Sequence, residues 1–276
     1  MSPVKEPAFF GAGDLLSPPY RDRVLDILAR DRAALQAYLD SPHRPTSWRF
    51  VLEWDDYLRL FRDVRDEIAI GEASTDYLWL PGAPGAIRSK LPEARLAFML
   101  RDPAERLFTM YLLAQWSNPR LTFAAWFRAG QVQAPIVEAG RYATQLQRYF
   151  DAFPDDQLRV YLYQDYCADM SAVLRDLFRF LGVRPDDPID LSRRYNETTV
   201  PRFPRMHALR RRLFGSASPA GWLPRGARRA IQRLYHTRST ARTMDPSDRR
   251  IVIDFYREEI LRTADLIGRD LSAWLR

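Results

Sequence analysis

RLAFMLRDPAERLFTMYLLAQW, residues 95–116, is the stretch that decides the fold. Its first part, RLAFML at 95–100, has the length and apolar character of a buried strand. A helix is predicted to follow at once, because Asp102 is a favourable N-cap residue and Pro103 suits the first helical position. The stretch therefore predicts a strand that runs directly into a helix, which is the repeating unit of α/β proteins.

A second strand and helix are predicted further along the chain. QLRVYLY, at 157–163, has the pattern of a strand, and the helix expected over 168–181 ends before Gly182, a suitable C-cap. Two such units indicate an α/β fold with a parallel sheet. Other elements are predicted as follows: helices over 21–39, 53–63 and about 82–92, and a short strand, EIAIGE, over 67–72.

We expect a single domain over residues 1–276, with a C-terminal helical extension over about 200–276. The length allows one large domain or two small ones, but no linker separates two cores and no internal repeat is present. The last segment is predicted to be helical because Ile253, Tyr256 and Ile260 recur on one face.

The composition is that of a globular protein with a basic surface. The formal net charge is +7, and the stretch from Thr198 to Met244 contains no acidic residue. Such a surface attracts anions such as nucleotides, sulfated sugars or lipid head groups, although a solvated face is the simpler interpretation. Nucleic-acid binding is disfavoured, because aromatic side chains are not interleaved with the arginines of the basic stretch as stacking platforms would be.

Cysteine and histidine usage limits the chemistry. The single cysteine, Cys167, excludes an intrachain disulfide, and we interpret it as a buried thiol in the reducing cytoplasm. No apolar run is long enough for a transmembrane helix. No metal is predicted, because His43, His207 and His236 lack the spacing of metal ligands.

Arg101 stands where the predicted strand meets the predicted helix. The free N–H groups of a helix start bind phosphate, and an arginine adds a bidentate donor at the carboxyl end of a strand. Thr109, two helical turns further on, can add a hydroxyl donor. The alternative interpretation is that Arg101 is a surface arginine and Thr109 an ordinary helical residue.

These residues resemble a segment of the sulfotransferases that use 3′-phosphoadenosine 5′-phosphosulfate (PAPS). That segment binds the 3′-phosphate with an arginine after a buried strand and a serine eight residues later, a position that Thr109 occupies here. MSPVKEPAFF, at 1–10, is similar to the KEPHFF segment of bacterial and glycosaminoglycan-type members. Three further segments resemble the family in the same order: GEASTDYLW (71–79), GRYATQLQRYFDAFPDDQLRVYLYQDY (140–166) and LIGRDLSAWLR (266–276).

The resemblance implies a fold, a reaction and a set of roles. The fold is a parallel sheet of the P-loop-kinase type flanked by helices, and the reaction is sulfuryl transfer from PAPS to a hydroxyl of a carbohydrate, glycolipid or other small molecule. Glu6 matches the proposed general base, and Lys5 is a candidate for contact with the substrate. Glu72 and Tyr77 are candidates for the acceptor cleft, and Arg202 for closing over the nucleotide. The simpler alternatives are a solvated Glu6, a structural Glu72 and a packed Tyr77.

One family motif does not occur in the sequence. The K-x-G-T-T loop that holds the 5′-phosphosulfate is missing, together with the strand before it and the helix after it. Roughly 30 to 40 upstream residues, about one βα unit, correspond to that region in relatives. Either the start codon is assigned too late, which we favour, or the chain is a catalytically silent relative that binds anions or a partner.

Overall fold

The structure is a computed structural model of the 276-residue chain. It describes residues 2, 6–22, 24–29, 35, 50–115, 118, 120–128, 132, 134–185, 199–201, 236–238 and 243–276. The chain divides into two compact units. The first comprises Met1–Leu100, Arg141–Asp187 and Asp265–Gly268, and the second Arg101–Gly140, Pro188–Ala264 and Arg269–Arg276. The expectation of a single domain with a C-terminal extension stays a prediction.

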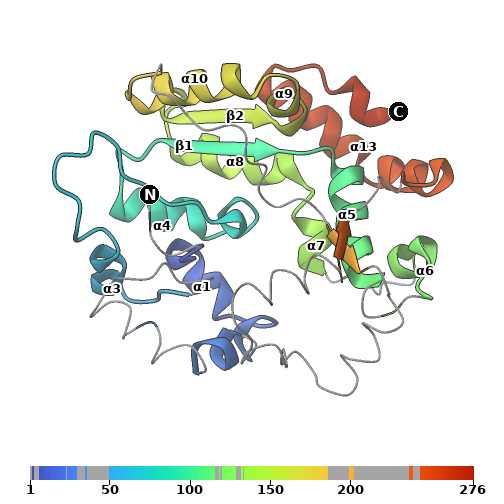
Figure 1. Ribbon diagram of the computed structural model, residues 1–276, viewed down its shortest axis with the longest axis horizontal. Coiled ribbons are helices and arrows are strands. Elements are labelled where there is room, and N and C mark those ends of the chain that lie inside the picture. Colours follow the sequence, from blue (N-terminus) through green and yellow to red (C-terminus); the bar gives the residue numbers. More distant parts are fainter. Residues whose placement is uncertain are drawn as a thin grey trace. The chain divides into compact units, whose positions relative to one another are not determined.

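The first unit is built on a two-stranded parallel sheet. Strand β1 (Leu96–Leu100) pairs with β2 (Leu158–Leu162), and the register runs from Leu96 opposite Leu158 to Leu100 opposite Leu162. Both predicted strands are therefore confirmed, and both end at the same edge of the sheet (Figure 1).

The other elements of the first unit are helical. They are η1 (Phe9–Gly11), α1 (Ala12–Leu15), α3 (Trp54–Arg59), η2 (Thr75–Leu78), α4 (Ala83–Lys90), α8 (Tyr142–Ala152), η3 (Asp155–Gln157), α9 (Tyr163–Ala168) and α10 (Met170–Leu181). Helices α3, α4 and α10 confirm three predicted helices. Helix α10 ends as expected at Gly182, whose φ of 75° is favourable only for glycine. Residues 24–29 are helical, and most of the rest of the helix predicted over 21–39 lies outside the described residues.

Helices α8 and α10 cover opposite faces of the sheet. Phe98 of β1 packs edge-on against Tyr149 of α8, with ring centroids 4.7 Å apart. Side chains alternate between the two faces along a strand, so Tyr161 of β2 points to the other face and donates a hydrogen bond to Asp176 of α10 at 2.8 Å. The side chain of Met99 is 45% exposed, so β1 is buried on one face and not on both as predicted.

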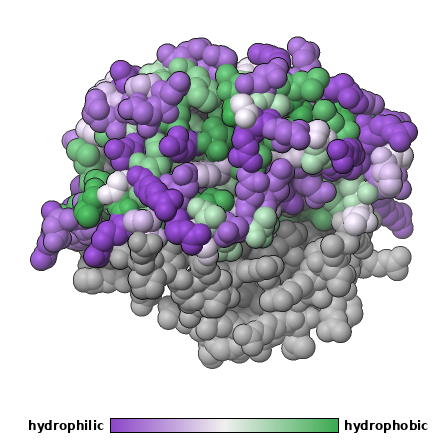
Figure 2. Space-filling model, turned by 90° about the horizontal axis from the view of Figure 1, so that it is seen from above, coloured by the Kyte–Doolittle hydropathy of each residue, from purple (hydrophilic) through white to green (hydrophobic). Residues whose placement is uncertain are grey.

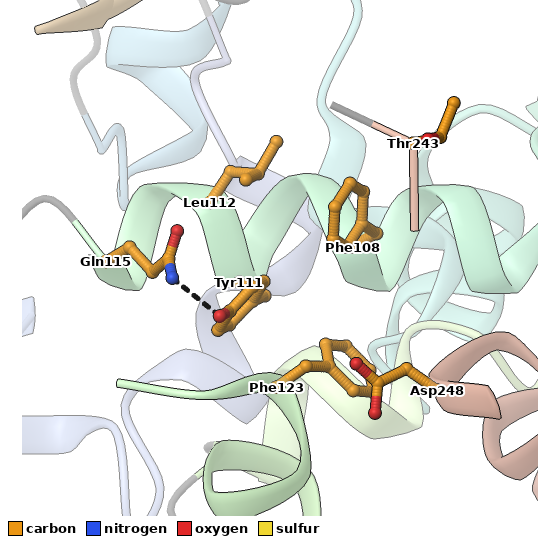
Figure 3. A pocket seen from close by; sticks show the side chains of 7 residues that line it. All are labelled: Phe108, Tyr111, Leu112, Gln115, Phe123, Thr243 and Asp248. Atoms are coloured by element: carbon orange, nitrogen blue, oxygen red, sulfur yellow. Dashed lines mark hydrogen bonds between the residues drawn. The ribbon is translucent and has the colours of Figure 1, made fainter. Parts of the chain in front are cut away.

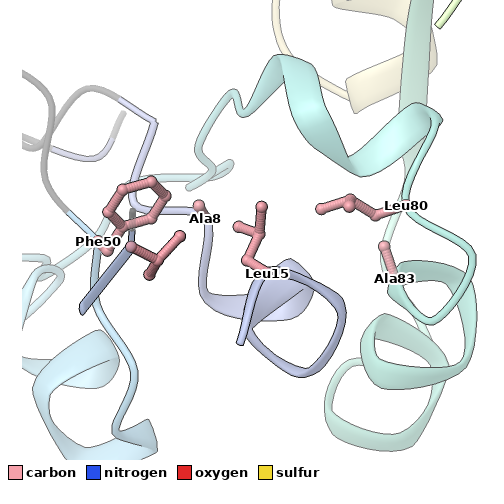
Figure 4. Packing of buried hydrophobic residues seen from close by; sticks show 6 residues of the cluster. Ala8, Leu15, Phe50, Leu80 and Ala83 are labelled. Atoms are coloured by element: carbon pink, nitrogen blue, oxygen red, sulfur yellow. The ribbon is translucent and has the colours of Figure 1, made fainter. Parts of the chain in front are cut away.

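A second apolar cluster of the first unit holds the N-terminal segment. Ala8 and Leu15 pack with Phe50, Leu80 and Ala83, all of them buried (Figure 4). Ala8 is 3% exposed and Leu80 is fully buried, so the segment after Glu6 is part of a core rather than a frayed end.

Two details of the first unit differ from the sequence predictions. EIAIGE, at 67–72, has no regular structure, and Ile68 and Ile70 are exposed. Their alternation suits a strand, but β1 pairs only with β2 among the described residues, and a strand is not stable without a partner. Cys167 is exposed and not buried as predicted, and it lies on the short helix α9, none of whose residues is buried.

The second unit contains most of the remaining helices and a small antiparallel pair. Its elements are α5 (Pro103–Gln115), α6 (Phe123–Arg128), α7 (Ala134–Glu138), β3 (Thr199–Pro201), β4 (His236–Arg238), most of α13 (Pro246–Ile267) and η5 (Ser272–Leu275). Helix α13 confirms the predicted C-terminal helix, and the face formed by Ile253, Tyr256 and Ile260 is buried.

Hydrophobic side chains also reach the surface. Figure 2 shows them in patches between hydrophilic side chains on the described part of one face. Leu58, Val64 and Leu91 are among the exposed large apolar residues of the first unit. Scattered exposure of this kind is normal in globular proteins.

Gly140 provides a test of the packing in the second unit. A Cβ at this position would lie 2.8 Å from Cζ of Tyr256, a fully buried ring whose hydroxyl donates to the carbonyl of Val137 at 2.7 Å. We expect Gly140→Ala to lower the free energy of unfolding by about 1–3 kcal/mol, because the ring has no room to move. Denaturant unfolding measures the change.

Gly85→Ala is the matched control. A Cβ at Gly85, inside α4, meets no atom within 4 Å. Alanine is the better helix former, so this variant should gain up to about 1 kcal/mol. An equal effect of the two substitutions would contradict the packing described around Tyr256.

Candidate functional site

The start of α5 carries the predicted phosphate-binding residues. Arg101 follows the last residue of β1, and Asp102 caps the helix: its Oδ1 accepts hydrogen bonds from the backbone N–H of Ala104 at 2.8 Å and of Glu105 at 3.4 Å. The predicted N-cap is therefore confirmed. The helix dipole adds partial positive charge at this end, which favours anions.

Four charged side chains meet at this helix start. Arg101 Nη2 lies 3.8 Å from Glu105 Oε2. Arg249, from the first turns of α13, donates to Asp102 Oδ2 at 2.6 Å, and its other terminal nitrogen lies 3.6 Å from Glu105 Oε1. The group contains two cations and two anions, so its formal charge is zero.

Arg249 was missed by the sequence prediction. It lies 147 positions from Asp102, and no local pattern links the two residues. The only signal in the sequence is the complementary charge. Arg249 matters because its positive charge offsets one of the two negative charges that would otherwise repel an anion at the start of α5.

Thr109 lies on α5 two turns after its start. Its hydroxyl donates to the carbonyl of Glu105 at 2.9 Å, the usual bond of a threonine within a helix. Arg101 has an exposed fraction of 37%, so its guanidinium is accessible to a ligand. Both predicted phosphate ligands therefore lie in the second unit, Arg101 just before α5 and Thr109 two turns into it. Each has an intramolecular partner.

Glu6 lies in a strained turn of the first unit. Glu6 and Ala8 both have a φ of 54°, in the left-handed region that residues other than glycine rarely occupy. Between them, the carbonyl of Pro7 accepts a hydrogen bond from the backbone N–H of Val51 at 2.8 Å. Such strain persists only where surrounding contacts enforce it, and it clusters at functional sites.

Glu72 and Tyr77 lie directly beside this turn. The carboxylate of Glu72 accepts hydrogen bonds from the hydroxyls of Tyr77 at 2.6 Å and Ser74 at 2.8 Å, and a further one from Tyr57. Burial and the neighbouring carboxylate raise the pKa of Tyr57 and Tyr77, so both hydroxyls remain protonated donors.

Burial also raises the pKa of Glu72, and the three hydroxyl donors oppose the shift. The folded chain therefore holds this proton more tightly than the unfolded chain does. It follows that the contribution of Glu72 to stability falls as the pH rises from the unfolded to the folded pKa. Burial of the ionised carboxylate lowers the free energy of unfolding, and the hydrogen bonds from the three hydroxyls reduce this loss.

The two adjacent phenylalanines fix the segment by aromatic packing. Phe9 stacks on Tyr57 with centroids 4.9 Å apart, and Phe10, which is 5% exposed, packs edge-on against Tyr77 at 5.7 Å. The ammonium group of Lys90 lies over the ring of Trp54 at 5.2 Å. This cluster keeps the turn that contains Glu6 close to the hydroxyl network.

Some predicted residues cannot be placed. Lys5 and Arg202 lie outside the described residues, as does most of the basic stretch from Thr198 to Met244. Within the described part of the chain, no three His, Cys, Asp or Glu side chains gather in a way that could hold a metal ion.

A cavity of about 440 Å³ lies in the second unit (Figure 3). The rings of Phe108, Tyr111 and Phe123 line it together with Asp248. Gln115 donates to the hydroxyl of Tyr111 at 2.5 Å at one end of the cavity. Of the predicted donor- and acceptor-binding residues that the structure describes, none lines this cavity.

The fold and the charged helix start define a class: a helix-rich α/β protein with a basic residue directly after a parallel strand. The sequence model of the Sulfotransferase family matches residues 21–187, which is more than half of the chain. The chain therefore belongs to the sulfotransferase family.

A solved structure agrees with this assignment. The crystal structure of a sulfotransferase from Alicyclobacillus acidocaldarius is 28% identical in sequence, with a TM-score of 0.57, and the match covers 82% of this chain and 76% of that one. The predicted family and the α/β fold are thus confirmed. A comparison with curated proteins gives no match. Among the described residues, no helix has the length and apolar character needed to cross a membrane.

Arg249 offers a test of the charge group at the start of α5. We expect Arg249→Ala to lower the free energy of unfolding by about 1.5–3 kcal/mol, because Asp102, with 13% of its side chain exposed, loses its cationic partner. Arg257→Ala is the control on the same helix. Its pair with Asp254 is exposed, so the loss should stay below about 1 kcal/mol. Equal losses in urea unfolding would show that the Arg249 pair contributes no more than a surface pair.

Proposed function

We propose that this protein transfers a sulfuryl group from PAPS to a hydroxyl of a carbohydrate, a glycolipid or another small molecule. The observation that carries the proposal is the junction of β1 and α5, where Arg101 follows the strand and Thr109 lies two turns along the helix. Membership of the sulfotransferase family supports the reaction class. The products are a sulfate ester and 3′-phosphoadenosine 5′-phosphate.

The start of α5 fits the 3′-phosphate of such a donor. The guanidinium of Arg101 has five N–H donors in a planar fork, a shape that matches the oxygens of a phosphate, and 37% of its side chain is exposed. Rotation of one side-chain bond turns the hydroxyl of Thr109 from the carbonyl of Glu105 toward a ligand. We assign these two residues to the 3′-phosphate, and Arg202 to a loop that closes over the nucleotide.

The first unit fits the acceptor side of the reaction. Bound PAPS supplies the sulfuryl group, and a sugar hydroxyl needs a base to become an effective nucleophile. We assign that role to Glu6, which the strained turn holds in a defined conformation. Lys5 is assigned to the substrate, and Glu72 and Tyr77 to the binding of the acceptor. The cytoplasm is the compartment that we propose for the reaction.

A second candidate function is a catalytically silent protein that binds anions or a partner. The pairing of Arg101 with Glu105 favours it, since an anion must compete with this carboxylate. The two functions differ in one measurable respect: only an enzyme moves radiolabelled sulfate from PAPS to a hydroxyl acceptor.

Arg101→Ala tests the donor side. We expect its affinity for 3′-phosphoadenosine 5′-phosphate to fall by about 10- to 100-fold, because a charge-assisted hydrogen bond to phosphate contributes about 1.5–3 kcal/mol. Isothermal titration calorimetry measures the affinity. Arg257→Ala, on the exposed face of α13, removes the same charge away from the proposed site and should leave binding unchanged. An unaltered affinity of Arg101→Ala would remove this residue from the site.

Glu6→Gln tests the acceptor side. We expect turnover to fall by about 10²-fold or more while nucleotide affinity is kept, because the amide cannot take a proton from the acceptor. The assay follows sulfate transfer to a panel of carbohydrate and glycolipid hydroxyls. Glu93→Gln, at an exposed position, controls for the loss of one carboxylate. A Glu6→Gln enzyme with full turnover would refute the assignment of the base.

A further inference from the structure

Two side-chain hydroxyls hold the turn that contains Glu6. The backbone N–H of Ala8 donates to Ser74 Oγ at 3.2 Å, and the backbone N–H of Phe10 donates to the hydroxyl of Tyr77 at 3.3 Å. These bonds connect positions 66 and 67 residues apart, and they fix both ends of the short segment that follows Glu6.

Both hydroxyls converge on one carboxylate. Ser74 Oγ donates to Glu72 Oε2 at 2.8 Å, and the hydroxyl of Tyr77 donates to Glu72 Oε1 at 2.6 Å. A hydroxyl has a single proton, so donation to the carboxylate turns its lone pairs toward the backbone N–H groups. A carboxylate accepts with both oxygens at once. Glu72 therefore determines the orientation of both hydroxyls.

The turn needs this support because its backbone is strained. Glu6 and Ala8 each have a φ of 54°, a left-handed conformation that is unfavourable for residues other than glycine. Without fixed acceptors for the N–H groups of Ala8 and Phe10, the segment would relax toward ordinary extended backbone. The Cα of Glu6, from which its carboxylate extends, would move with it.

We propose that Glu72 is a positioning residue that orients the carboxylate of Glu6 through two parallel links, Ser74 to Ala8 and Tyr77 to Phe10. The inference rests on the proposed function, in which Glu6 is the base. It adds a role for Glu72 that needs no contact with the substrate. The half-buried position of Glu72 agrees with this role, because all the hydrogen bonds described for its carboxylate come from the network itself.

The two links can be separated by substitution. Of the two backbone N–H groups, Tyr77→Phe removes the acceptor of Phe10 and Ser74→Ala that of Ala8, and each variant also removes one hydroxyl donor to Glu72. Glu72→Gln keeps the shape of the side chain but offers one acceptor oxygen in place of two, so it weakens both links. Glu93→Gln is the matched control for charge.

The first measurement is amide hydrogen exchange of the folded chain, followed residue by residue by NMR. We expect Glu72→Gln to speed exchange at both Ala8 and Phe10 by about 10-fold or more. Tyr77→Phe should speed exchange at Phe10 alone, and Ser74→Ala at Ala8 alone. Unchanged exchange at both positions in Glu72→Gln would overturn the inference. If that variant does not fold, the selective pattern of the other two decides in its place, and its absence overturns the inference.

The second measurement is sulfate transfer. We expect Glu72→Gln to lower kcat by about 10-fold with KM and affinity for 3′-phosphoadenosine 5′-phosphate unchanged, because the base is displaced and the binding groups are not. Faster exchange with full kcat would overturn the role in positioning. A chain that binds the nucleotide but transfers no sulfate would refute the proposed function itself, and the exchange pattern alone then decides whether Glu72 holds the turn.

Discussion

The direct passage from β1 into α5 is the constraint on which the rest of the structure depends. The strand ends at Leu100 and the helix begins at Pro103, so only Arg101 and Asp102 make the connection. So short a turn leaves helix N–H groups to be satisfied, and Asp102 accepts two of them. Because β1 is paired in parallel with β2, Arg101 follows the carboxyl end of a parallel strand, which is where α/β proteins bind ligands.

The cap creates an electrostatic problem that the second unit solves with Arg249. A carboxylate is a good cap for a helix start, but it repels the anion that the same helix start would bind. Arg249 donates to Asp102 and lies near Glu105, so its charge offsets one of the two negative charges beside Arg101. The C-terminal helix thus contributes to the chemistry at α5 through charge.

The sequence predicts structural features well where the signal lies within a few residues, and poorly where a feature depends on residues far apart in the chain. The apolar run of β1, the cap at Asp102 and the glycine after α10 all act within a few residues, and the structure confirms each of them. EIAIGE, at 67–72, has a strand-like pattern without a partner strand, which a local pattern cannot reveal. Arg249 depends on a contact across 147 positions. Family resemblance suggests Glu72 and Tyr77 as candidates. It does not predict the hydrogen bond between them or the one from Phe10 N–H to Tyr77.

Two unfavourable features of the first unit, a strained backbone turn and a half-buried carboxylate, have one explanation. A left-handed φ at Glu6 and Ala8 costs free energy, and so does the half-buried carboxylate of Glu72, whose pKa burial raises. Glycine at position 8 and a neutral side chain at position 72 would each reduce one of these costs. A chain that keeps both around a single segment gives up stability to hold one backbone geometry, which is the usual relation between stability and a preorganised site. Glu72 in the first unit and Arg249 in the second are alike in one respect, since each is a partly buried charge held by hydrogen bonds to side chains of its own unit.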